Sequence, residues 1–135
     1  FCEQSLFDLI GNLDSNEKDS LRRVSQIMII LVSFCEKNPG LARILTREAF
    51  SIDEAALELR VKQIFAKFEL KIKQDLQKYE QETKKKLVLP TASGANLLLA
   101  FVEGTIQQYV RSGFQEKPSE RLKDQVGFLI GSLKK

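Results

Sequence analysis

The stretch FCEKNPGLARILT, residues 34–46, decides the fold, because it ends one helix and starts another within a few residues. Pro39 disfavours the helical conformation at Asn38, and Gly40 can adopt backbone angles that other residues avoid. Lys37 precedes this corner, where a cation complements the dipole of the helix that ends there. The stretch therefore predicts a fixed corner between two helices, with Lys37 and Asn38 presented at it.

Apolar residues recur at spacings of three and four on both sides of the corner, which is the pattern of amphipathic helices. Six helical segments are predicted, at 1–13, 17–37, 41–49, 53–85, 95–115 and 119–133. Ser51 and Glu54 have the spacing of a capping box, which predicts a helix start there. Residues 87–94 are expected to form a flexible loop, and the pattern as a whole predicts an all-α domain.

The composition limits the class of protein. A chain of 135 residues with 43% hydrophobic and 29% charged residues predicts a single domain, 1–135, with a substantial core. The net charge of +3, from 21 basic and 18 acidic residues, is too even to imply nucleic-acid binding by itself. No segment approaches the roughly 20 apolar residues that cross a membrane, so no membrane contact is predicted.

Residues for catalysis or metal binding are scarce. The chain has no histidine, the commonest metal ligand and general base. Neither a phosphate-binding loop nor a nucleophile elbow is present, so the sequence predicts no enzyme, no cofactor and no metal site. Cys2 and Cys35 are interpreted as buried thiols in a reducing compartment. Glu103 interrupts an apolar helix, and we expect its carboxylate to be hydrogen-bonded near a subunit interface.

The two C-terminal segments are apolar on more sides than one domain of this size requires. The simplest explanation is a second copy of the chain, with two antiparallel helices from each subunit forming a four-helix interface. Gly127 and Gly131 provide a groove of small residues on the last helix. The sequence thus predicts an obligate homodimer through Leu99, Val102, Ile106, Tyr109, Val110, Val126, Leu129, Ile130 and Leu133.

Three strings resemble a known family. They are FCEKNPGLARILT at 34–46, RVKQIFAKFE at 60–69 and LLAFVEGTIQQYVRSGFQEKP at 98–118. In this order they are similar to the C-terminal regulatory and dimerisation domain of TetR-type regulators, and among these to the nucleoid occlusion factors. The chain begins with Phe in what reads as the middle of a helix, so we expect that an N-terminal helix-turn-helix is missing from it.

The resemblance implies a function. Such factors bind specific chromosomal DNA sites through the N-terminal helix-turn-helix, and they bind the C-terminal tail of the division protein FtsZ and inhibit ring assembly over the nucleoid. Under this interpretation the chain is a bacterial, cytoplasmic and nucleoid-associated homodimer that touches DNA only through the missing domain.

The resemblance also implies a site for the FtsZ tail, in a groove between the first helix and the next one. Its positions fall on Phe1, Ile30, Ser33, Lys37 and Asn38. Phe1 and Asn38 match the family residue, whereas Lys37 replaces an arginine and Ser33 replaces a glycine. Leu9 stands where the family has a functional arginine. An apolar groove with a cationic end suits an extended peptide with apolar and acidic groups.

The alternative is the effector domain of a TetR-type transcriptional regulator that senses a small molecule. The ligand pocket would then lie inside the bundle. Its predicted lining is almost entirely apolar and consists of Leu21, Met28, Phe65, Phe68 and Phe101. A packed interior favours the tail-binding hypothesis, and an enclosed cavity favours the effector hypothesis.

Overall fold

The fold is a bundle of helices, as predicted. The computed structural model describes residues 7–12, 17–46 and 55–135, and these residues contain no strand. Residues 7–12 are helical. The other elements are α2 (Ser20–Lys37), α3 (Pro39–Leu45), α4 (Ala55–Thr83), α5 (Thr91–Arg111), the 3-10 helix η1 (Pro118–Glu120) and α6 (Leu122–Leu133).

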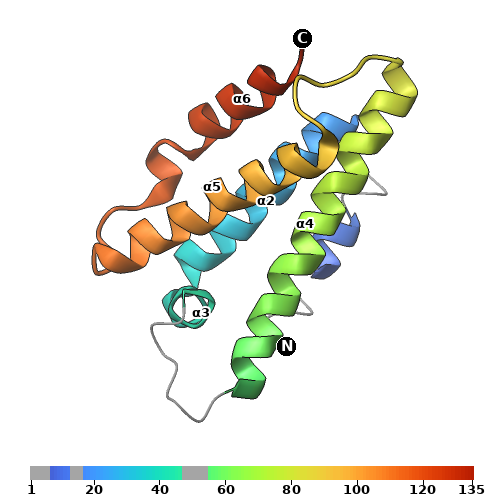
Figure 1. Cartoon of the computed structure of the whole chain (residues 1–135). Coiled ribbons are helices and arrows are strands. Elements are labelled where there is room, and N and C mark those ends of the chain that lie inside the picture. Colours follow the sequence, from blue (N-terminus) through green and yellow to red (C-terminus); the bar gives the residue numbers. More distant parts are fainter. Residues whose placement is uncertain (1–6, 13–16, 47–54) are drawn as a thin grey trace.

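Helix α2 occupies the centre of the bundle. It contacts α3, α4, α5, η1 and α6, and α4 and α5 also pack against each other. Figure 1 shows α5 and α6 side by side, with residues 7–12 behind α4. Val24 and Met28 of α2 have no exposed surface, and neither have Phe68 of α4 and Leu98 of α5. Helix α2 is thus apolar on more than one side because it has neighbours on several sides.

The start of α2 differs from the expected position by three residues. The Asp19 side chain accepts hydrogen bonds from the backbone N–H groups of Leu21 at 3.0 Å and Arg22 at 3.3 Å. A carboxylate in this position satisfies amide groups that have no partner within the helix. Asp19 therefore ends the run of non-helical residues, and α2 begins at Ser20 rather than at Glu17.

The corner is tighter than the sequence suggests. Only Asn38 separates α2 from α3, with φ −132° and ψ 77°, and Pro39 is the first residue of α3. Proline is well placed there because the first helical N–H group has no intrahelical partner. Gly40 lies inside α3, and Gly113 is the chain's one glycine with a positive φ. The conformational freedom assigned to Gly40 is therefore not used.

The predicted loop is shorter than 87–94, because α5 already begins at Thr91. Its backbone is also fixed at two points. The Leu87 N–H donates to the Glu80 carboxylate and the Val88 N–H donates to the Leu133 carbonyl, both at 2.8 Å. These bonds tie the connection to α4 and to the end of α6. The predicted capping box at Ser51 and Glu54 lies outside the described residues.

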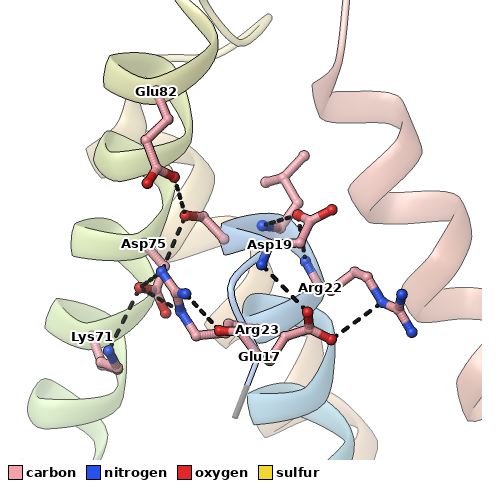
Figure 2. A network of polar contacts seen from close by, with 9 residues as sticks. Glu17, Asp19, Arg22, Arg23, Lys71, Asp75 and Glu82 are labelled. Atoms are coloured by element: carbon pink, nitrogen blue, oxygen red, sulfur yellow. Dashed lines mark hydrogen bonds and ion pairs between the residues drawn. The ribbon is translucent and has the colours of Figure 1, made fainter. Parts of the chain in front are cut away.

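A buried ion pair joins α2 to α4, and the sequence reasoning missed it. The Arg23 guanidinium donates to Asp75 Oδ1 from Nε at 3.3 Å and from Nη2 at 3.2 Å, and both residues are 3% exposed. Lys71 Nζ lies 3.5 Å from the same oxygen. Figure 2 shows Arg23 between the two helices, where it also donates to the Glu17 carbonyl and the Ser20 hydroxyl. This network fixes the N-terminal part of α2 against the middle of α4.

Candidate functional site

The predicted peptide site lies on one face of α2. Ile30, Ser33 and Lys37, which we call the α2 stripe, follow each other at spacings of three and four and therefore share a side of the helix. Ile30 and Ser33 are partly exposed and Lys37 is exposed. Phe1, which is also predicted to belong to the site, lies outside the described residues. Leu9 is 44% exposed in the helical residues 7–12 and presents an apolar surface without charge.

Asn38 has most of its hydrogen-bonding capacity occupied within the chain. Its side-chain Nδ2 donates to the Phe34 carbonyl at 2.7 Å, and its backbone N–H donates to the Cys35 carbonyl at 3.2 Å. Both carbonyls belong to the last turn of α2, where no intrahelical donor is available. The side-chain Oδ1 and the second hydrogen of Nδ2 thus remain as the groups that Asn38 can offer to a partner.

Glu36 connects the end of α2 to two other elements. Its carbonyl accepts the Tyr109 hydroxyl of α5 at 2.8 Å, and its Oε1 accepts the backbone N–H of Ser119 in η1 at 2.9 Å. We refer to these two bonds as the Glu36 contacts. Together with the bonds made by Asn38, they give partners to three consecutive carbonyls before Lys37. The cation and Asn38 are therefore presented on a fixed helix end.

Tyr109 is well suited to remain a donor in this position. Its ring packs edge-on against Phe114, with 5.3 Å between the centroids. Burial, and secondarily the negative charge of Glu36 and the neighbouring Cys35, raise the pKa of the Tyr109 phenol above its usual value. The hydroxyl is therefore protonated throughout the physiological pH range. No sequence signal pointed to this role, because the partners are 73 positions apart.

Most of the residues predicted for the dimer interface are buried within one chain. Leu99, Val102, Ile106, Tyr109, Val110, Val126, Ile130 and Leu133 are all buried within one chain, with exposed fractions between 1% and 8%. Leu129 is the one residue of the predicted set that remains partly exposed. These eight side chains pack inside one chain, which leaves them little surface to offer to a second copy. Their apolar character is explained by the packing of α5 against α2, α3 and α4 and by the packing of α6 against α2.

A different apolar face remains open on α5 and α6. Phe128 is 74% exposed and Leu97 is 45% exposed. Phe128 borders a shallow hollow of about 350 Å³, whose other lining residues are Phe101, Asp124, Gln125 and Leu129. A methyl group added at Gly104, Gly127 or Gly131 would meet no atom within 4 Å. This surface, which we call the α5–α6 face, is therefore both apolar and free of bulky cover in the single chain.

A larger cavity lies between α3, α4 and α5. It has a volume of about 540 Å³, and its lining is Leu45, Thr46, Glu58, Leu59, Val61, Lys62, Phe65, Glu103, Ile106 and Gln107. Of the five residues predicted to line an effector pocket, Phe65 alone lies there. Leu21, Met28 and Phe68 are packed in the core instead. The interior of the bundle is thus filled, and the open space lies towards one end of it.

Glu103 lies at this cavity, and its predicted hydrogen bond near the subunit interface is absent among the described residues. Partial burial and, secondarily, the Glu69 carboxylate raise the pKa of Glu103 above its usual value. A carboxyl group in such a place favours ligands that bring a donor or a positive charge. The interruption of the apolar pattern at Glu103 therefore coincides with the cavity.

Other features show little reactive chemistry. The predicted burial of Cys35 is confirmed: it is 1% exposed, and burial raises the pKa of its thiol to about 12. Cys2 lies outside the described residues. Within the described part of the chain, no three His, Cys, Asp or Glu side chains are placed to hold a metal ion. None of its helices is both long and apolar enough to span a bilayer.

Comparison with known families gives a match over most of the chain. Residues 18–134 match the SlmA-like family described as "Tetracyclin repressor-like, C-terminal domain". The nucleoid occlusion factor SlmA of Shewanella amazonensis is 40% identical over 129 residues, which cover 96% of this chain and 66% of that protein. SlmA of Colwellia psychrerythraea is 39% identical over 132 residues, which cover 98% and 67%. The chain thus spans about two thirds of the length of these relatives.

A solved structure supports the fold alone. The crystal structure of the transcriptional regulator FadR from Bacillus subtilis in complex with stearoyl-CoA superposes with a TM-score of 0.76. The superposition covers 97% of this chain and 72% of that chain, and 10% of the aligned residues are identical. The arrangement of helices therefore occurs in a transcriptional regulator whose sequence is very different.

Proposed function

Because this chain belongs to the SlmA-like family of tetracycline-repressor-like C-terminal domains, we propose that it is the dimerisation and partner-binding part of a nucleoid occlusion factor. The two relatives from Shewanella amazonensis and Colwellia psychrerythraea named above are both nucleoid occlusion factors. In this proposal an N-terminal helix-turn-helix, outside this chain, recognises chromosomal DNA. The present domain binds the FtsZ tail and thereby inhibits ring assembly over the nucleoid.

The observation that carries the proposed tail binding is the α2 stripe. It offers an apolar side chain at Ile30, a small hydroxyl at Ser33 and an exposed cation at Lys37, in that order along one side of a helix. An extended peptide with apolar and acidic groups complements such a surface. Lys37 retains the charge of the family's arginine but provides a point charge rather than a planar fork. We therefore expect charge attraction without two-point recognition of a carboxylate.

Titration of the chain with a fluorescent peptide of the FtsZ C-terminal tail tests this proposal. We expect saturable binding that the substitution Lys37→Glu weakens at least about tenfold, because attraction becomes repulsion. Lys85→Glu is the matched control, since Lys85 is an exposed lysine in the connection between α4 and α5. Absence of binding by the unmodified chain, or equal losses in the two variants, would contradict the proposal.

We also propose that the domain forms a homodimer through the α5–α6 face. The exposed Phe128 and the adjacent hollow beside Phe101 and Leu129 provide a side chain and a recess for it on each copy. A two-fold axis lets both copies use the same surface, so each Phe128 can enter the hollow of the partner. Gly104 of α5 and Gly127 and Gly131 of α6 leave room for close approach of the helices.

A second function, that of a small-molecule receptor, is favoured by the cavity between α3, α4 and α5. Its volume of about 540 Å³ is in the range that small-molecule sites occupy, roughly 300–1,000 Å³. The lining combines apolar side chains with Lys62, Glu103 and Gln107, which could orient a ligand. This function concerns a different surface from the α2 stripe, so the two candidates are experimentally separable.

A further inference from the structure

Helix α2 ends at a point where four carbonyl groups lack intrahelical donors, and the way in which they are satisfied is specific. Asn38 satisfies the carbonyls of Phe34 and Cys35, and these bonds are local. The Glu36 carbonyl takes its donor from Tyr109, in the last part of α5. The backbone next to Lys37 is thus held by a helix that is remote in sequence.

The second Glu36 contact is made with η1. The Ser119 N–H donates to Glu36 Oε1 at 2.9 Å, and η1, which contains Ser119, leads directly into α6. Pro118, the first residue of η1, is buried. Glu36 therefore touches both α5 and the connection to α6, which are the elements that carry the proposed dimer face.

From this juxtaposition we infer that Tyr109 and Glu36 are positioning residues for the α2 stripe, and that they link partner binding to the arrangement of α5 and α6. The inference rests on the proposed tail binding and adds a regulatory connection to it. The hydroxyl of Tyr109 fixes the carbonyl that precedes Lys37, and the Glu36 carboxylate fixes the same turn to η1. Loss of either bond lets the helix end fray, which lowers the population of the conformation that presents Lys37.

The test is peptide titration of a set of variants of the 135-residue chain, with the FtsZ C-terminal peptide as probe. Tyr109→Phe removes one hydroxyl and keeps the ring packed against Phe114. We expect about fivefold weaker binding, because a partly buried carbonyl loses its donor. Tyr79→Phe is the matched control, since it removes a phenol from α4, and it should change the affinity less than about twofold.

Glu36 provides a second, independent variant. Glu36→Ala removes the acceptor for Ser119 and should weaken binding about threefold, whereas Glu36→Gln retains an acceptor oxygen and should stay within about twofold of the unmodified chain. This pair separates the hydrogen bond from the charge beside Lys37. It also keeps the inference testable if Tyr109→Phe folds poorly.

A double-mutant cycle distinguishes positioning from general loss of stability. In a Lys37→Ala background, Tyr109→Phe should have less than a twofold further effect, because the side chain that it positions is gone. Undiminished loss in that background, or no loss in the unmodified background, would overturn the inference and leave the proposed tail binding intact. Failure of the unmodified chain to bind the peptide would instead overturn the proposed tail binding, and the inference with it.

Discussion

Replacement of Asp75 by alanine is expected to destabilise the domain by about 3–5 kcal/mol, the usual cost of leaving one member of a buried ion pair without its partner. The Arg23 guanidinium is 3% exposed and donates twice to Asp75 Oδ1. Arg23 also donates to the Glu17 carbonyl and to the Ser20 hydroxyl, which are neutral acceptors. Thermal unfolding followed by circular dichroism should show the midpoint falling by roughly 10 °C.

The control for this prediction is the neighbouring ion pair between Arg22 and Glu17, which is more exposed. Arg22 Nε lies 3.4 Å from Glu17 Oε1, and the Arg22 side chain is 72% exposed. Arg22→Ala should cost less than about 1 kcal/mol, because exposed ion pairs contribute little. Equal midpoints for Asp75→Ala and Arg22→Ala would show that the Arg23–Asp75 pair does not stabilise the packing of α2 against α4.

Replacement of Phe128 by aspartate is expected to convert the proposed dimer into monomers. Phe128 is 74% exposed on α6, so the substitution disturbs no packing within one chain. In the dimer it would place two carboxylates in an apolar interface, each unpaired and removed from water. Light scattering after gel filtration at micromolar concentration should give twice the 15.4 kDa chain mass for the unmodified protein and the chain mass itself for the variant.

Leu70→Asp provides the matched control for the dimer. Leu70 is 54% exposed on α4, away from the α5–α6 face, so this variant should remain dimeric. A monomeric mass for the unmodified chain would contradict the proposed dimer. A dimeric mass for Phe128→Asp would place the interface on another surface.

The all-α fold was predictable because apolar spacing reports directly on helices. The stripe of Val61, Ile64, Phe68, Ile72 and Leu76 is buried along α4 as its period required. Helix ends were less predictable, since they depend on single contacts. Asp19 takes the cap of α2, although Asp14, Ser15 and Asn16 are also good capping residues.

The apolar pattern predicted which residues are buried. It did not predict which element covers each buried face. Val102 and Ile106 of α5 are as apolar as an interface requires, yet both are buried within one chain, where α5 packs against α2 and α4. The correct signal for an open face is an apolar residue off the main stripe, and Phe128 is such a residue. The sequence also held a sign of the buried pair, because Arg23 and Asp75 adjoin the core residues Val24 and Leu76.

Some features of the candidate site could likewise be predicted from the sequence, and others could not. The corner itself followed from Asn38 and Pro39, and the resemblance supplied the positions of the α2 stripe. The Glu36 contacts could not be predicted, since Tyr109 and Ser119 are 73 and 83 positions away and neither belongs to a recognisable motif. Such bonds depend on how three elements meet, which helical periodicity does not encode.

The most direct test of the proposed tail binding is residue-resolved. Amide chemical shifts of the ¹⁵N-labelled chain should be recorded by NMR during titration with the FtsZ C-terminal peptide. We predict that the shift changes cluster at Ile30, Ser33, Lys37 and Asn38, and that the cavity between α3, α4 and α5 is unaffected. Shift changes confined to the cavity lining, for example at Val61 and Ile106, or no changes at saturating peptide, would contradict the proposed role of the α2 stripe.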